Sequence, residues 1–138
     1  MFDDLQERVK RYPTDLRLRY EFGVLLYATE QTNEAIQQFQ LSQRNPKHRI
    51  ESLYHIALCF KRKHQDDMAI EQLESANAEL PVMNDAKKDV LYELGVLYES
   101  SGNRDKAAVC YKQVYQTDIG YKDIAQKIEH VYQKPKAG

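Results

Sequence analysis

The feature that most constrains this chain is a spaced pattern of small and large apolar residues, which occurs three times. The third copy consists of Gly95, Tyr98, Ala107 and Tyr111. The residues 38 positions earlier are Ala57, Phe60, Ala69 and Leu73, and a further 34 positions earlier stand Gly23, Leu26, Ala35 and Phe39. Small residues match small ones and large residues match large ones in every copy. A period of this length is typical of helical-repeat proteins.

Each copy has the spacing of two helices joined by a short break. Between Val90 and Tyr111 the apolar residues recur at steps of three and four on both sides of Gly102, which predicts one helix before that glycine and one after it. Gly102 favours the left-handed conformation that ends many helices. Neither helix can bury its apolar stripe alone, so the two helices are expected to pack against each other.

The pattern resembles that of the tetratricopeptide repeat family, whose unit is a helix-turn-helix of about 34 residues. The residues that carry the resemblance are Gly23, Ala35, Phe39 and Pro46, then Ala57, Ala69, Leu73, Ala76 and Pro81, then Gly95, Ala107 and Tyr111. The family's first aromatic position lacks Trp and holds Arg19, Leu53 and Leu91, while Ser42 replaces a late Ala and Ile119 a third Pro. The resemblance implies an all-α fold, a right-handed superhelical stack (α-solenoid) of about eight helices.

The repeats divide the chain into segments of one expected domain, residues 1–138. These are a half-repeat helix (1–13), three repeats (14–47, 48–83 and 84–119), and a capping helix with a tail (120–138). A natural N-terminus seldom begins inside a repeat, so the half-repeat suggests a piece of a longer chain.

The chain departs from the regular repeat at two places, before the third repeat and after it. The register slips by four residues before the third repeat, close to one helical turn, so we expect an extra turn starting at a cap on Asn84 or Asp85; a longer loop is the alternative. The capping helix should run from about Tyr121 to Gln133, with Tyr121, Ile124, Ala125, Ile128 and Tyr132 inward and its polar side outward. Residues 134–138 should form a frayed tail.

Composition excludes several classes of partner. The chain has 20 basic and 21 acidic side chains, a net charge of −1, so no overall field favours nucleic acid or an anionic membrane. No apolar run approaches the roughly 18 residues that span a bilayer. Cys59 and Cys110 lie inside helical patterns, which favours core packing over a disulfide framework and indicates a reducing, cytoplasmic compartment.

The sequence contains no recognisable catalytic set. It has no glycine-rich phosphate loop, no Gly-x-Ser-x-Gly and no Cys-x-x-Cys. The four histidines, His48, His55, His64 and His130, do not have the spacing of a metal-ligand motif. We therefore expect no enzyme activity, no metal and no cofactor.

The resemblance implies a binding groove, because the first helix of each repeat lines the concave side of such stacks. The positions that point there are Arg17, Tyr20, Glu21, Val24 and Tyr27, then Glu51, Tyr54, His55, Leu58, Lys61 and Arg62, then Asp89, Tyr92, Glu93, Val96 and Glu99. They include a tyrosine row (Tyr20, Tyr54, Tyr92) and, one turn further along the same face, an aliphatic row (Val24, Leu58, Val96). Tyrosine offers large contact area and a hydroxyl, which suits peptide recognition; packing between repeats is the alternative role of the row.

Charge along the groove indicates the ligand. Family members that clamp a terminal carboxylate use Lys, Arg and Asn at positions that here hold Tyr20, Val24, His55, Asp89 and Glu93, and the last two would repel a carboxylate. We therefore expect a protein or peptide partner whose bound segment is amphipathic and carries both charges. The alternative is a structural role through self-association of the stack, which would make the protein a homo-oligomer.

Overall fold

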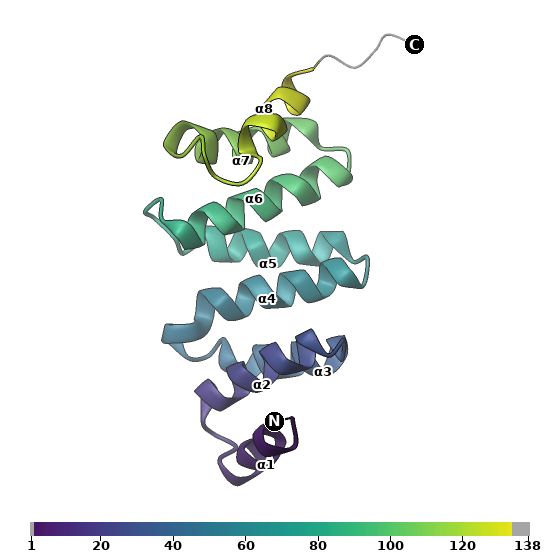
Figure 1. Cartoon of the computed structure of the whole chain (residues 1–138), viewed down its shortest axis with the longest axis vertical. Helices are drawn as coiled ribbons and strands as arrows, with labels where there is room; N and C mark the ends of the chain where they lie inside the picture. Colours follow the sequence, from purple (N-terminus) through teal and green to yellow (C-terminus); the bar gives the residue numbers. More distant parts are fainter. Residues whose placement is uncertain (1, 134–138) are drawn as a thin grey trace. The chain divides into compact units, whose positions relative to one another are not determined.

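The computed structural model describes residues 2–133, which form eight α-helices and one short 3₁₀ helix and, within that range, no strand (Figure 1). The α-helices are α1 (Phe2–Arg11), α2 (Leu16–Ala28), α3 (Thr32–Ser42), α4 (Arg49–Arg62), α5 (Asp66–Ala78), α6 (Asp85–Ser100), α7 (Arg104–Thr117) and α8 (Ile124–Tyr132). The 3₁₀ helix η1 (Pro46–His48) precedes α4. The predicted all-α helical-repeat class is confirmed. The chain divides into two compact units, Met1–Ala76 and Asn77–Gly138, here called unit 1 and unit 2 and described separately.

Side-chain caps set the beginning of three of these helices. The Asp15 carboxylate accepts hydrogen bonds from the backbone N–H groups of Arg17 and Leu18, at 3.0 and 3.2 Å, and so starts α2. Asn84 caps α6 through the N–H of Lys87, at 2.9 Å, and Asn103 caps α7 in the same way. The extra turn before the third repeat is therefore confirmed, and the longer loop is not formed.

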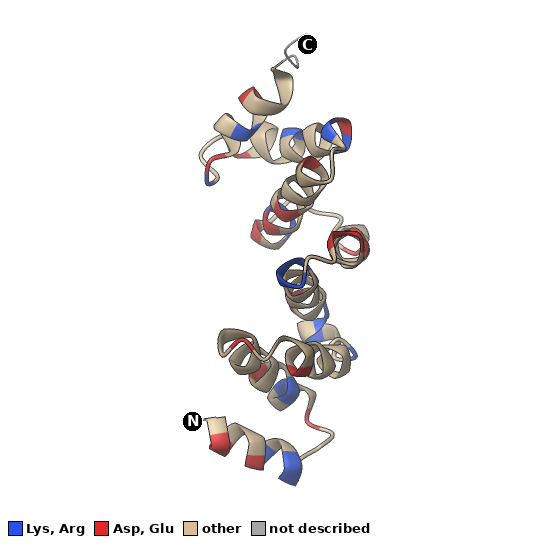
Figure 2. Cartoon of the chain, turned by 90° about the vertical axis from the view of Figure 1, so that its right-hand side faces the viewer, with Lys and Arg blue, Asp and Glu red and all other residues tan. Residues whose placement is uncertain are grey.

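Unit 1 contains the helices α1 to α4 and nearly all of α5. α1 packs on α2, α2 on α3, and α3 on α4. The ring of Phe2 meets that of Phe22 edge-on with 5.5 Å between centroids, so the first helix packs on the following hairpin as predicted. Acidic residues occupy the first turn of α1 and basic residues its last turn (Figure 2), which complements the helix dipole.

Two glycines allow a close approach of the helices in the two hairpins. A Cβ atom at Gly23 of α2 would lie 2.7 Å from Cε1 of Phe39 on α3, and one at Gly95 of α6 would come closer still to the ring of Tyr111 on α7. Both aromatic side chains are fully buried. The sequence pattern of small against large residues thus corresponds to direct contact between the paired helices.

A buried pair of serines joins α3 to α4. The Ser42 and Ser52 hydroxyl oxygens lie 2.7 Å apart, and Ser42 also donates to the Phe39 carbonyl at 3.2 Å. Both serines are completely buried. The departure from Ala at Ser42 is therefore a structural feature: its hydroxyl satisfies that of Ser52 on the next helix.

Unit 2 contains a second hairpin and a final helix. α6 packs on α7, and α7 on α8. The final helix is shorter than predicted, because the chain bends at Lys122, which has a φ of 43°. Tyr121 consequently precedes the helix, and Tyr132 is 56% exposed while Val131 is buried in its place. The predicted inner face is wrong at Tyr132. The tail predicted at 134–138 lies outside the described residues.

Left-handed residues end three first helices at equivalent positions. Gly102 has a φ of 83°, as its sequence position predicts. Glu30 and His64 take the same conformation, with φ of 63° and 59°, where side chains make it costlier. Their role was not apparent from residue type, because neither is a usual left-handed residue.

Candidate functional site

In unit 1 the predicted groove positions bring together a group of rings, the His55 cluster, defined as His48, His55, Tyr20, Tyr27 and Tyr54. The Tyr20 ring stacks on His48 at 4.9 Å and meets His55 edge-on at 5.7 Å. His55 also meets Tyr27 and Tyr54 edge-on, at 6.1 and 6.0 Å. All five side chains are half-buried, so the cluster presents aromatic surface on α2 and α4.

The cluster rests on the core and has defined polar contacts. His55 stacks on the buried ring of Phe39 at 5.0 Å. Its Nδ1 lies 2.8 Å from the Glu51 carbonyl oxygen, which can only accept, so Nδ1 is the donor of this hydrogen bond. Burial, with the charge and hydrogen bond of the Glu51 carboxylate, raises the pKa of Tyr20 to about 12. The tyrosine therefore stays neutral at physiological pH.

Arg62 holds one edge of the cluster. Its guanidinium carbon lies 3.7 Å from the centre of the Tyr27 ring, and its Nη1 donates to the Tyr27 carbonyl at 2.8 Å. A cation stacked on an aromatic face in this way is attracted by the ring quadrupole. The positive charge of Arg62, one of the predicted groove residues, is thus held at Tyr27.

The other predicted positions of unit 1 surround these rings. Arg17, Glu21 and Glu51 are exposed, and Leu58 and Lys61 are half-buried. Val24 is 37% exposed, which is high for an aliphatic side chain on a packed helix. Members of the tyrosine and aliphatic rows in this unit are therefore accessible to a ligand. The contacts of Tyr20 also support the alternative that part of the tyrosine row serves packing.

In unit 2 the predicted groove residues of α6 contact the C-terminal segment. The Tyr92 hydroxyl donates to Asp123 at 2.6 Å, and its ring meets that of Tyr121 at 5.8 Å. The Tyr121 hydroxyl donates to Asp89. Burial, with the hydrogen bond and charge of Asp123, raises the pKa of Tyr92 to about 12. Glu93 and Val96 lie half-buried on the same helix.

Glu99 forms a three-residue connection between the helices of this unit. One of its carboxylate oxygens accepts from the Tyr111 hydroxyl of α7 at 2.9 Å, and the other lies 2.5 Å from Nδ1 of His130 on α8. Burial and the Glu99 carboxylate raise the pKa of Tyr111 well above its usual range. Glu99 therefore ties α6 to both following helices.

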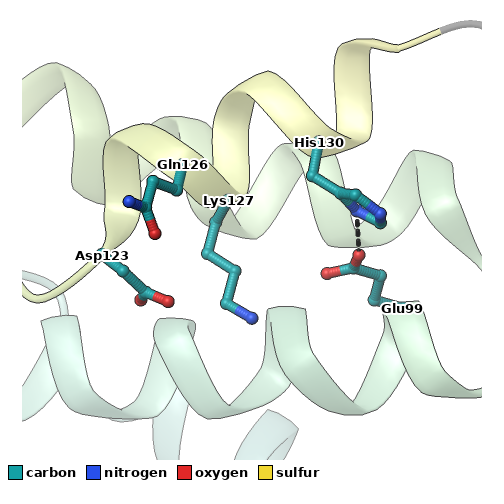
Figure 3. A pocket seen from close by; sticks show the side chains of 5 residues that line it. All are labelled: Glu99, Asp123, Gln126, Lys127 and His130. Atoms are coloured by element: carbon teal, nitrogen blue, oxygen red, sulfur yellow. Dashed lines mark ion pairs between the residues drawn. The ribbon is translucent and has the colours of Figure 1, made fainter.

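A pocket of about 310 Å³ opens between α6 and the final helix (Figure 3). It is lined by Glu99 of α6 and by Asp123, Gln126, Lys127 and His130 of the C-terminal segment. The sequence analysis placed the polar side of the final helix outward, and Asp123, Gln126 and His130 are exposed. Four polar residues of this segment also point toward α6 and border the pocket, which was not predicted (Figure 3). Their spacing of three and four residues put them on one face, but nothing in the sequence showed what that face meets.

The sequence analysis also predicted that the two cysteines pack in the core and that the histidines do not form a metal-ligand motif. Cys59 and Cys110 are buried in α4 and α7, as core packing requires, and burial raises the pKa of Cys59 to about 11. Among residues 2–133 no three side chains are grouped as a metal site would need. No helix in that range combines the length and apolarity needed to cross a bilayer.

Residues 89–118, most of α6 and all of α7, match the family profile described as "Tetratricopeptide repeat". This segment therefore has the sequence of a tetratricopeptide repeat. The profile covers most of the third predicted repeat, residues 84–119. No sequence among curated proteins matches the chain.

Solved structures support a helical-repeat fold over the rest of the chain. Two crystal structures of MamA are 22% identical, with TM-scores of 0.80 and 0.81; each covers 95% of this chain, and 69% and 74% of the respective MamA chain. A third structure is that of a Podosopora anserina putative kinesin light chain with nearly identical TPR-like repeats. It is 18% identical with a TM-score of 0.76, and the match covers 96% of this chain and 76% of the kinesin light chain structure. At these identities the likeness concerns the fold.

Proposed function

We propose that this chain is a non-catalytic interaction module that binds a peptide or helix of a partner protein over the first helices of its repeats. The observation that carries the proposal is the His55 cluster with its exposed neighbours. Partly exposed tyrosines give large contact area at low entropic cost, and each hydroxyl can pair with a peptide backbone.

The surroundings of the cluster favour an extended or helical segment over a small metabolite. Val24 and Leu58 add aliphatic surface, and charges of both signs border it: Arg17 and Lys61 against Glu21. A segment with alternating apolar and charged residues would match this surface. No catalytic role is proposed, because the perturbed groups of unit 1 are tyrosine and cysteine residues whose raised pKa values keep them neutral.

The test begins with a peptide selected on the immobilised protein from a displayed random library. Its affinity is then measured by calorimetry for the wild type and for a Tyr54→Ala, Leu58→Glu double variant. Removing an aromatic contact and placing a charge on the aliphatic row should weaken binding at least tenfold, about 1.4 kcal/mol.

The matched control is Gln37→Ala, Gln40→Glu, which makes comparable changes at exposed positions of the second helix α3. This variant should bind like the wild type. Equal affinity of a still-folded Tyr54→Ala, Leu58→Glu protein would refute the assignment of the binding surface. Light scattering over a concentration series tests self-association separately.

A further inference from the structure

The pocket between α6 and the final helix has an unusual distribution of engaged and unengaged charges. Both oxygens of Glu99 are held, by Tyr111 and by His130, and one oxygen of Asp123 is held by Tyr92. The second Asp123 oxygen accepts no hydrogen bond from residues 2–133. Two carboxylates are thus each held by a tyrosine of the α6–α7 hairpin, as a preorganised site requires.

The remaining charged side chain of the pocket is that of Lys127. The Lys127 side chain extends from α8 toward α6, between Asp123 and Glu99 (Figure 3). In the described part of the chain its ammonium makes no ion pair or hydrogen bond. Besides His130, the charged side chains that line the pocket are two carboxylates and one ammonium. A long, flexible side chain without a partner is displaced at little cost by a cation that fits better.

We propose that this pocket binds an arginine side chain. A guanidinium presents five donors in a planar fork, which suits a site of fixed acceptors better than the point charge of an ammonium. The open Asp123 oxygen and the Gln126 amide oxygen offer two such acceptors, and each engaged Glu99 oxygen keeps a second lone pair. The pocket volume, about 310 Å³, is at the lower end of ligand sites, as one side chain needs.

The inference rests on the proposed function only in taking the arginine from a partner segment, since the pocket lies wholly in unit 2. It also gives the acidic third repeat a chemical role. The binding of arginine itself is measurable with no partner and no contribution from the His55 cluster. The two proposals can therefore fail separately.

The experiment titrates the full chain, labelled with ¹⁵N, with N-acetyl-L-argininamide. Saturable chemical-shift changes are expected at residues 123–130, with a dissociation constant on the order of millimolar, as for a fragment of this size. N-acetyl-L-citrullinamide has almost the same shape without the charge and should give none. N-acetyl-L-glutamate amide tests the opposite charge and should also give none.

Variants then separate charge recognition from structure. Asp123→Asn keeps an oxygen for the Tyr92 hydroxyl but removes the charge, and should weaken binding about fivefold. Lys127→Met removes the competing cation and should tighten it severalfold. Glu129→Gln and Lys10→Met, both exposed, repeat these charge changes away from the pocket and should leave the affinity unchanged.

The opposite signs expected for Asp123→Asn and Lys127→Met are the decisive result, because loss of structure would weaken both. Equal shifts with the citrulline compound, preferential binding of the glutamate compound, absence of saturation, or weaker binding by Lys127→Met would each overturn the proposal.

Discussion

The α2–α3 hairpin of unit 1 and the α6–α7 hairpin of unit 2 share a glycine–aromatic contact. They differ in how the aromatic residue is linked to the helix that follows the hairpin. Phe39 has no polar atom and stacks on the ring of His55 on α4. Tyr111 occupies the equivalent place, yet its hydroxyl donates to Glu99, which also pairs with His130 of α8. The repeat fixes the size of this residue and leaves its polarity open. One scaffold therefore carries an aromatic surface in one unit and a polar pocket in the other.

The largest expected effect concerns the glycines themselves. Gly95→Ala places a methyl group against the ring of Tyr111, which is buried and hydrogen-bonded. Overpacking costs about 1–3 kcal/mol, only partly offset by the better helix propensity of alanine, about 1 kcal/mol. Gly23→Ala makes a less severe contact with Phe39 and should cost less. Urea denaturation of both variants measures the difference.

A second substitution sharpens this prediction. The middle repeat has Ala57 and Leu73 at the equivalent positions, so Gly95→Ala with Tyr111→Leu copies that pair. If steric overlap is the cause, the double variant loses less stability than the two single variants predict together. Strict additivity would show that the glycine is needed for another reason.

The next effect follows from the hydroxyl of Tyr111, because the equivalent residue of the first hairpin, Phe39, has none. The pKa of Tyr111 is raised in the folded protein, so the folded state keeps a proton that the unfolded chain loses above about pH 10. Stability is full below that pH and falls as pH rises, by about 1.4 kcal/mol per pH unit for each proton retained. Tyr111→Phe should cost about 1–2 kcal/mol at pH 7, and its deficit relative to wild type should shrink above pH 10.

Tyr12→Phe is the control for this titration, because Tyr12 is 54% exposed. It should leave both the stability at pH 7 and its alkaline dependence unchanged. A deficit of Tyr111→Phe that stays constant from pH 8 to 11 would contradict the role given to the Glu99 hydrogen bond.

The smallest expected effect concerns the turns that follow α2 and α6. Glu30 ends α2 and Gly102 ends α6 in the same left-handed conformation. Glu30→Gly removes strain of about 1 kcal/mol but gives the unfolded chain more freedom, so a net gain of a few tenths of a kcal/mol is expected. Gly102→Ala should lose about 1 kcal/mol. Thermal unfolding measures both, and a clear loss with Glu30→Gly would show that its side chain matters more than its backbone.

The repeated pattern of apolar residues predicted the helices well. Burial of one helix face places apolar residues three or four positions apart, and this spacing can be read directly from the sequence. The extra turn of α6 was predictable for the same reason, since an Asn cap and helix-compatible residues precede it. The start of α8 was not, because Lys122 adopts a positive φ that its residue type does not favour. Resemblance to a repeat family supplied the groove residues of both units, but it did not reveal that His48 joins the His55 cluster.

The sequence by itself determined the class of fold and the faces of the helices, since both follow from the period of apolar residues. Only the tertiary structure decided what those faces meet. Tyr92 and Glu99 were placed on a binding surface from sequence, and the structure shows them contacting Asp123 and His130 more than 30 residues along the chain. Local spacing fixes direction, whereas the partner of a polar side chain depends on which helix returns beside it, and that is set by packing across the whole unit.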